Sequence, residues 1–320
     1  MEQEPRQRLP TIHVAYATTP DGFPGLLHSL NSLARNVPSE ESLSVHVVVP
    51  QEHVGRANAV LGCFSEEVKD LPPRDLRVQV YPMKKLGFDT SPMLNTTRGW
   101  MRSWGNLRLS RPTVFARFYL HEMLPREVER VLWLDVDTIV KGDVGPLYRM
   151  RMTRPVAARM PGSNRTVGAA FPRWSCVQHL DPATSFAYFN TGVMVMNMSW
   201  FRAEDFTRPL EKAAYRCTTN DQPSMNIVFM DRGVDFFNRT FNVMSMGNPG
   251  VRKRRWPEDA VILHWQGPVK PWEQPEKCDQ NATLQEVDPA CLSGRNMREW
   301  MKYRPHHRCT AVTKRALAGL

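Results

Sequence analysis

The chain has 320 residues, of which 42% are hydrophobic and 23% charged, with a formal net charge of +10 and a pI near 9.5. These values fit a globular protein with a sizeable core, and they exclude a collagenous, coiled-coil or wholly disordered chain. No stretch of 18 or more apolar residues occurs, so no membrane-spanning helix is predicted. The positive charge favours an anionic partner, but no nucleic-acid-binding motif accompanies it, so nucleic acid is not expected.

Residues 1–10 are polar and charged, and we expect a disordered tail that is neither a signal peptide nor a membrane anchor. Either the protein is cytosolic, or its targeting segment lies outside this chain. Two features favour the second reading: an even number of cysteines, six, and five Asn-X-Ser/Thr sequons. The sequons begin at Asn95, Asn164, Asn197, Asn238 and Asn281. We expect Asn197 to close a buried strand and to be a poor glycan acceptor.

The cysteines leave two interpretations open. Cys278, Cys291 and Cys309 cluster near the C-terminus, and no C-x-x-C pair is present, so a zinc site is not expected. Disulfides and structural buried thiols both remain, and the sequence assigns no pairing.

The first part of the chain alternates predicted strands and helices. Strands are predicted at 11–17, 43–49 and 76–81, where β-branched and apolar residues gather. Helices are predicted over 26–35, where leucines recur at helical spacing, and over 54–68. This β-α-β-α-β order predicts a parallel, doubly wound sheet.

Residues 82–112 contain no regular pattern. Long loops without structure of their own are often functional, and this one carries Trp100, Met101 and Trp104. We therefore expect a lid or an acceptor-binding loop here. A helix is predicted to follow over 114–123.

Further strands are predicted at 130–134, 156–160, 186–196 and 261–263, with a helix over 221–230. Beyond Trp272 the chain becomes polar and rich in Cys, Pro and Arg. We expect residues 11–272 to form one domain. Residues 273–320 should form an irregular C-terminal extension with a short helix near 294–303.

A pair of carboxylates gives the sharpest chemical signal. The apolar run 131–134 is followed at once by Asp135, Val136 and Asp137. Ligands of open α/β sheets bind outside the carboxyl ends of the strands, and two adjacent carboxylates there repel each other unless a cation neutralises them. A divalent ion held by oxygen ligands meets that need. The alternative is a surface turn after an edge strand.

A histidine ends another predicted strand at the same edge. His264 follows 261–263, and its imidazole suits Mn²⁺ better than Mg²⁺. Gly267 allows close backbone approach to a ligand, and Lys270 places a point charge suited to a diphosphate. The alternative is a core histidine followed by a structural Gly-Pro turn.

Two further segments carry polar groups at informative positions. Asn190 and Gly192 interrupt the apolar run 186–196, as polar residues in a strand often do where it meets a ligand. Asp221 and Gln222 open the predicted helix, where an acid is also a routine cap or first-turn residue.

Together these segments resemble glycosyltransferase family 8, which includes glycogenin, bacterial lipopolysaccharide galactosyltransferases and the galacturonosyltransferase-like proteins. The resemblance runs from Thr11 to Trp272. It is carried by ARFYLHEMLP…RVLWLDVDTIVKGDVGPLY, FNTGVMVMNMSWFR, DQPSMN and HWQGPVKPW.

The resemblance implies a GT-A fold, which is a Rossmann-like single domain with a mixed, mostly parallel central sheet flanked by helices. It also implies a UDP-sugar donor, Mn²⁺ rather than Mg²⁺, retention of anomeric configuration, and a glycan, lipid or protein hydroxyl as acceptor. The transferred sugar, the oligomeric state and the choice between double displacement and a front-face reaction stay open. The Golgi lumen is the expected compartment, with the cytoplasm as the alternative.

The resemblance also implies roles for individual residues. The implied metal ligands are Asp135, Asp137 and His264. The implied donor-binding residues are Ala17, Thr18, Thr19, Arg117, Asp135, Val136, Asn190, Gly192, Gly267 and Lys270. The implied catalytic residues are Asp221, Gln222 and Asn190. The chain departs from the family in the turn after its first strand, where many members carry an earlier acid and where Asp21 is the substitute.

Two other functions are weighed. LDVDTIV resembles the nucleophile motif of haloacid-dehalogenase-like phosphohydrolases, with Asp231 and Asp235 as distal acids. Met230 stands where that motif has glycine, and the motif leaves FNTG and HWQGPVKPW unexplained. A non-catalytic nucleotide-sugar or glycan binder of the same fold is the second alternative.

Overall fold

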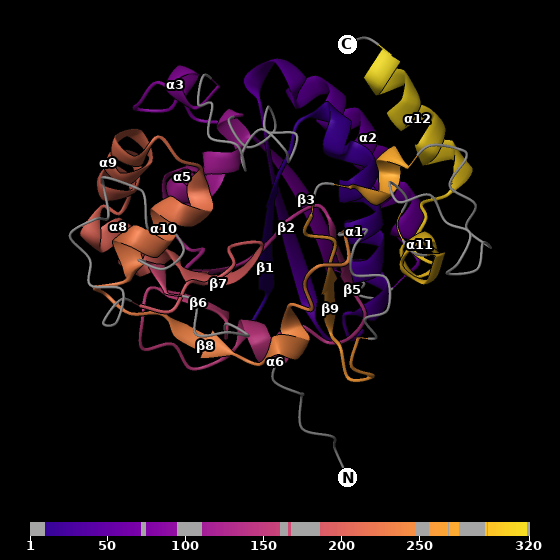
Figure 1. Ribbon diagram of the computed structural model, residues 1–320. Coiled ribbons are helices and arrows are strands. Elements are labelled where there is room, and N and C mark those ends of the chain that lie inside the picture. Colours follow the sequence, from indigo (N-terminus) through magenta and orange to yellow (C-terminus); the bar gives the residue numbers. More distant parts are fainter. Residues whose placement is uncertain are drawn as a thin grey trace.

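The computed structural model describes residues 10–71, 75–94, 111–160, 166–167, 186–247, 256–267, 269–274, 292 and 294–318. Its described part is a sheet of seven strands between two layers of helices (Figure 1). The strands are β1 (Ile12–Ala17), β2 (Ser42–Val49), β3 (Asp75–Pro82), β4 (Arg130–Leu134), β6 (Val156–Arg159), β7 (Val193–Asn197) and β8 (Asp235–Phe237).

The sheet is mixed but mostly parallel, as predicted. Its order is β3-β2-β1-β4-β7-β6-β8. β3, β2, β1 and β4 are mutually parallel, β7 is antiparallel to both β4 and β6, and β8 is parallel to β6. A separate antiparallel pair joins β5 (Thr138–Val140) to β9 (Ile262–His264). The carboxyl ends of β1, β4, β6 and β8 therefore share one edge of the main sheet.

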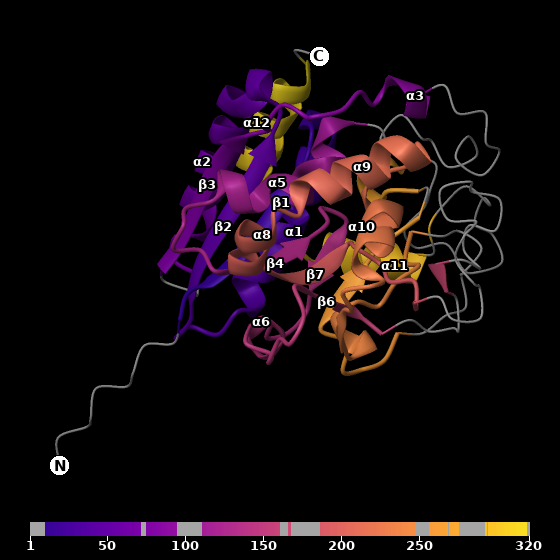
Figure 2. The same ribbon diagram turned by 90° about the vertical axis from the view of Figure 1, so that its left-hand side faces the viewer.

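Helices cover both faces of the sheet, as the two views show (Figures 1 and 2). One layer consists of α1 (Phe23–Asn36), α2 (Val54–Val68), α11 (Gly294–Met301) and α12 (His307–Ala318). The other consists of α5 (Ala116–Met123), α8 (Met198–Glu204), α9 (Thr207–Cys217) and α10 (Asp221–Phe229). The short helices α3 (Ser91–Leu94) and α6 (Gly145–Tyr148) lie in connections. Turns of 3₁₀ helix span Pro20–Gly22, Gln51–His53, Pro112–Phe115, Arg239–Phe241 and Pro271–Glu273.

Alternate side chains of each central strand enter different cores. Leu132 and Leu134 of β4 pack with α1 and α2, whereas Val131 and Trp133 pack with α5, α8 and α10. All four are at most 1% exposed. Because both faces of the strand are buried, the strand is apolar throughout rather than alternating. This continuous apolar run leads directly into the carboxylate pair.

The long strand predicted at 186–196 is wrong in its extent, since the ladder begins only at Val193. The backbone before it is paired differently. The Phe189 N–H donates to the Asn226 side chain at 2.8 Å, and the Phe189 carbonyl accepts from the same amide at 2.9 Å. An asparagine side chain therefore replaces a neighbouring strand, and the segment that carries Asn190 leaves the sheet.

Other boundaries differ at their ends. The helix predicted over 114–123 begins as a 3₁₀ turn at Pro112, and α5 proper starts at Ala116. Proline favours a first helical turn because it lacks the N–H that has no partner there. The predicted loop 82–112, with Trp100, Met101 and Trp104, lies mostly outside the described residues.

The C-terminal extension is more ordered than predicted. Beyond the helix near 294–303, α12 follows and packs against α2, and Cys309 forms a disulfide with Cys63. The pairing left open by the sequence is thus assigned for these two residues. Trp300 of α11 is 1% exposed and packs edge-on against Trp265, so this extension also supports the segment after β9. Among the described residues, none of the helices has the length and apolar character that a membrane span requires.

Candidate functional site

The site is built where β4 ends and the small β5–β9 pair begins. The Asp135 N–H donates to the Gly192 carbonyl at 2.8 Å, and the Trp265 N–H donates to the Asp137 carbonyl at 2.8 Å. In the β5–β9 ladder, Thr138 lies opposite His264. Three segments far apart in the sequence therefore meet around the carboxylate pair.

The predicted metal ligands do come together. Each of Asp135, Asp137 and His264 offers one ligand atom, and these atoms lie within 4.8 Å of one another. His264 Nε2 is 3.3 Å from Asp137 Oδ1 and 3.8 Å from Asp135 Oδ2. Asp137 is 5% exposed and His264 only 1%. This set of two carboxylates and one imidazole, in which only Asp135 is partly exposed, suits a divalent ion.

The proton on His264 gives an independent test of that fit. The buried Asn242 Oδ1, which can only accept, lies 3.0 Å from His264 Nδ1. The imidazole therefore donates from Nδ1 and turns the lone pair of Nε2 towards the two carboxylates. With the ring neutral, three acceptor groups face one another, and a cation between them would relieve their repulsion. An outer hydrogen bond of this kind is the usual way in which a metal-ligating histidine is oriented.

The space beside these ligands is kept open by Gly192. A Cβ on this residue would lie 2.2 Å from His264 Cε1 and 2.7 Å from Asp135 Oδ2. Any larger side chain would occupy the room between the ligands. The interruption of the apolar run at 192 thus has a steric cause, which its sequence position alone did not reveal.

Lys270 lies at the same cluster, as predicted. Its Nζ donates to Asp137 Oδ2 at 2.5 Å. Burial alone would raise the pKa of Asp137, but the Lys270 ammonium holds that pKa well below its usual range. Gly267 has φ +149°, a backbone angle that favours glycine. The glycine turn therefore returns the chain so that the lysine faces the carboxylates.

Arg117 links the two predicted acids. Its guanidinium is 3.1 Å from Asp135 Oδ1 and 2.8 Å from Asp221 Oδ2, and it also donates to the Thr191 carbonyl at 2.7 Å. The arginine is 4% exposed and lies over the Trp133 ring at 4.3 Å. Its contacts in this structure are thus with the protein, and its predicted contact with the donor remains a prediction.

Asp221 is buried and held from two sides. Besides Arg117, the Thr191 hydroxyl donates to Asp221 Oδ2 at 3.0 Å. Burial raises the pKa of Asp221, Arg117 opposes the rise, and the neighbouring Asp135 adds to it. The acid at the start of α10 is therefore part of the site and not a simple helix cap.

A chain of amide groups runs from the histidine to Gln222. Asn242 Nδ2 donates to Asn190 Oδ1 at 3.0 Å, and Asn190 Nδ2 donates to Gln222 Oε1 at 2.9 Å. Gln222 Nε2 then donates to the Tyr188 hydroxyl at 2.9 Å. The predicted catalytic residues Asn190 and Gln222 are thus fixed relative to the ligand cluster.

The turn after β1 lies near the carboxylate pair, because β1 pairs with β4. Thr18 and Thr19 follow Ala17, the last residue of β1, and Thr19 donates its hydroxyl proton to Asp21 Oδ1 at 2.6 Å. Arg111 donates to both the Thr19 hydroxyl and the Asp21 carboxylate, at 2.7 and 2.5 Å. Asp21 is therefore already paired.

The remaining predicted donor residue is Val136, between the two acids. Its side chain is partly buried and packs against the core shared with α1 and α2. That packing fixes the turn in which both carboxylates point towards His264.

Sequence reasoning missed four residues of this network: Asn242, Thr191, Trp133 and Arg111. Trp133 donates its Nε1 proton to Asp135 Oδ1 at 2.9 Å. Thr191 stands inside the FNTG motif, so its neighbours gave a signal. Asn242 follows a 3₁₀ turn and carries no sequence signal that separates it from a surface asparagine.

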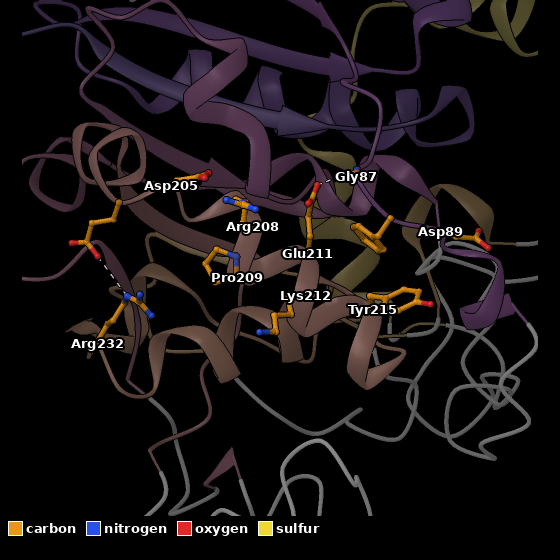
Figure 3. Close-up of a pocket in the computed structure, with 11 residues that line it drawn as sticks. Gly87, Asp89, Asp205, Arg208, Pro209, Glu211, Lys212, Tyr215 and Arg232 are labelled. Carbon is orange, nitrogen blue, oxygen red and sulfur yellow. Dashed lines mark hydrogen bonds and ion pairs between the residues drawn. The ribbon is translucent and has the colours of Figure 1, made fainter.

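A pocket lies apart from this cluster, on the outer face of α9 (Figure 3). It measures about 930 Å³ and is lined largely by charged side chains, among them Arg208, Lys212 and Arg232. None of the predicted site residues lines it.

Solved structures with the same fold are glycosyltransferases. The galactosyltransferase LgtC, solved with donor and acceptor sugar analogs, is 16% identical with a TM-score of 0.59, over 94% of this chain and all of that one. GlyE of Streptococcus pneumoniae is 17% identical with a TM-score of 0.58, over 95% of this chain and 63% of that one. At these identities the likeness establishes the fold, which is GT-A.

The sequence places the chain more narrowly. The profile of "Glycosyl transferase family 8" matches residues 13–276. The chain belongs to this family.

Curated relatives agree with the family assignment. "Probable galacturonosyltransferase-like 8" of Arabidopsis thaliana is 27% identical over 278 residues, 82% of this chain and 66% of the relative. "Glycosyltransferase 8 domain-containing protein 2" of Macaca fascicularis is 30% identical over 196 residues, 52% of this chain and 56% of the relative. The chain thus spans about two thirds of the length of the first of these relatives and 56% of the length of the second.

Asp235, one of the two distal acids in the phosphohydrolase alternative, does not belong to the carboxylate cluster. Asp235 lies in β8 and accepts hydrogen bonds from the Thr153 and Arg154 backbone N–H groups at 2.6 and 2.9 Å. Both carboxylate oxygens are engaged, because the Thr153 hydroxyl donates to the other one at 2.8 Å. This acid caps a turn and does not face Asp135.

Proposed function

We propose that the protein is a retaining glycosyltransferase that uses a UDP-sugar donor and Mn²⁺, held by Asp135, Asp137 and His264. The observation that carries the proposal is the cluster of two carboxylates and one histidine, with its lone pair turned inwards by Asn242. Mn²⁺ fits this donor set better than Mg²⁺ because one ligand is imidazole. When bound, the metal supplies positive charge next to the diphosphate leaving group.

Lys270 is proposed to share that task. Its ammonium reaches the cluster from the segment after β9, and a fixed cation there stabilises negative charge that builds on the departing diphosphate. Gly267 lets this segment approach the donor closely. Thr18, Thr19 and Ala17 at the end of β1 are proposed to receive the nucleoside, and Gly192 leaves room for the sugar-phosphate link.

The geometry favours a front-face reaction over a double displacement. A nucleophilic carboxylate must be free to reach the anomeric carbon, but Asp221 is 6% exposed and bound by both Arg117 and Thr191. Gln222 is more exposed, and Asn190 and Tyr188 fix its amide. We therefore assign Gln222 to the reacting face and Asp221 to positioning.

The catalytic unit is proposed to comprise residues 11–272, with the C-terminal helices packed on it. The acceptor is a hydroxyl of a glycan, lipid or protein, and the net charge of +10 suits an acidic one. The Cys63–Cys309 disulfide supports an oxidising compartment, because such bonds form and persist in the secretory pathway. The Golgi lumen is therefore proposed as the site of action.

A donor panel tests this function. The purified protein is incubated with Mn²⁺ and each of several UDP-sugars, and UDP release is measured. We expect release from one donor, abolished by EDTA and by the double variant Asp135→Ala, Asp137→Ala. A matched control is Asp75→Ala, which removes an exposed carboxylate on β3 whose partner is the exposed Arg77. Retained UDP binding without turnover, even with acceptors added, would favour the non-catalytic binder.

A further inference from the structure

Two of the five sequons lie among the described residues, and their surroundings differ. Asn238 is exposed, follows β8 directly and is followed by the exposed Arg239. Its Oδ1 accepts from the Thr240 N–H at 3.1 Å. The amide nitrogen, which is the atom that a glycan modifies, has no hydrogen-bond partner in the described part of the chain. A sugar added there displaces no protein contact.

Asn197 provides the contrast within the same chain. It is the last residue of β7, where it lies opposite Arg130 in the ladder, and its N–H donates to the Pro155 carbonyl at 2.9 Å. Its side chain caps α8 by accepting from the Trp200 N–H at 3.0 Å. Both of its sequence neighbours, at positions 196 and 198, are fully buried. Backbone and side chain are therefore fixed among packed residues, and a bulky glycan has no room.

Asn238 directly follows β8, which is an edge strand of the sheet. β8 ends the sheet order, so one side of this strand has no neighbouring strand among the residues that the structure describes. An open strand edge is a template for pairing with other chains unless it is covered. Met160, whose N–H donates to the Phe237 carbonyl at 3.1 Å, is 49% exposed and lies on the other, paired side of β8, where β6 and β8 end together. An exposed apolar side chain and a strand edge thus lie on either side of Phe237, the residue before the sequon.

We propose that Asn238 carries an N-linked glycan that covers the open edge at β8 and Met160. In the modification, the Asn238 side-chain nitrogen forms a bond to C1 of an N-acetylglucosamine. The bond from C1 to a lipid diphosphate breaks, the lipid diphosphate leaves, and the amide gives up one proton. The oligosaccharide donor is a lipid-linked diphosphate sugar of the secretory pathway. The inference rests on the lumenal location proposed above and not on the sugar transferred by the enzyme.

The glycan is compatible with an open active site. β8 is three places from β4 in the sheet order, so strand spacing alone puts Asn238 about 14 Å across the sheet from the carboxylate pair. Asn238 is separated from Asn242, the residue that orients His264, by the rigid 3₁₀ turn at Arg239–Phe241. A sugar on the exposed side of that turn leaves the buried side unchanged.

The test uses two substitutions at one position. The full chain is led into the secretory pathway of a eukaryotic cell as wild type, Thr240→Ser and Thr240→Ala. The serine variant keeps the sequon and the alanine variant destroys it, while both keep Asn238 and the backbone donor at 240. Glycopeptide mass spectrometry, with enzymatic removal of glycans in heavy-oxygen water, reads the occupancy of each sequon. A non-reducing digest of the same sample reads the Cys63–Cys309 bond.

We expect Asn238 to be occupied in the wild type and in the serine variant, and Asn197 to be empty in all three. The alanine variant should aggregate several-fold faster on gentle heating, with unchanged donor turnover. An empty Asn238 in protein whose disulfide has formed would overturn the proposal, as would equal occupancy of Asn197. Turnover is measured separately, so failure of the glycan and failure of the proposed activity give different results.

Discussion

Replacing Asn242 by alanine should weaken Mn²⁺ binding without dismantling the sheet. Asn242 is fully buried, accepts from His264 Nδ1 at 3.0 Å and donates to Asn190 Oδ1 at 3.0 Å. Its loss leaves a buried imidazole N–H without a partner, which costs about 1–3 kcal/mol. It also frees the imidazole to rotate or to change tautomer, and removing such an outer partner lowers metal affinity by about 10–100-fold.

Calorimetric titration with Mn²⁺, with and without UDP, measures this change directly. The matched control is Asn31→Ala. Asn31 is also fully buried and donates to two backbone carbonyls, those of Tyr303 and Arg304, but it lies far from the ligand cluster. Both variants should lose about 1–3 kcal/mol of unfolding free energy, and only Asn242→Ala should lose Mn²⁺ affinity. Equal Mn²⁺ affinity in the two variants would refute the role given to Asn242.

Three further changes probe the site and its support. Gly192→Ala should reduce Mn²⁺ affinity at least about 10-fold, by analogy with changes to the outer partners of a metal ligand, because the new methyl lies 2.2 Å from His264 Cε1 and 2.7 Å from Asp135 Oδ2. Gly142→Ala, where the nearest neighbour is 3.6 Å away, should leave the affinity unchanged, and equal titrations would contradict the steric argument. Cys309→Ser, which cannot bridge to Cys63, should lower the free energy of unfolding by about 2–5 kcal/mol, since the bond closes a loop of 246 residues; an unchanged denaturant midpoint would mean that the bond adds no stability. Burial lowers the pKa of His28 to about 4, although a backbone hydrogen bond opposes this shift. Between pH 6.5 and pH 4 the unfolded chain therefore binds a proton at His28 that the native chain does not bind. Stability due to this group should be complete above pH 6.5 and fall by about 3 kcal/mol towards pH 4; denaturant titrations should show a weaker pH dependence for His28→Gln, and an identical dependence would show that other groups cause it.

Much of the fold follows from the sequence because its pattern is local. Leu26, Leu27, Leu30 and Leu33 recur at helical spacing, and α1 buries all four to 1% exposure or less. The pairing of β4 with β1 places the turn with Asp135 and Asp137 beside the first strand. The apolar run that precedes this turn is buried on both faces.

The parts that could not be predicted depend on contacts between distant segments. Segment 186–192 has strand-like composition, but the side chain of Asn226 supplies its pairing from α10, 37 residues away. Asn242 matters because it reaches His264, and no spacing rule connects the two. α12 was missed because its polar sequence gains its support from α2 through packing and the disulfide.

The order of the sheet has a consequence for how the protein is made. All seven strands are complete by Phe237, yet His264 and Lys270 follow only later in the chain. During synthesis the central sheet can therefore form while Asp135 is paired with Arg117 but Asp137 still lacks its later partners, His264 and Lys270. Asp137 gains these partners only when β9 docks on β5 and the segment after β9 follows it. The last quarter of the chain thus completes the cluster, and a ribosome that stops before residue 264 releases a chain that lacks one of the three proposed metal ligands.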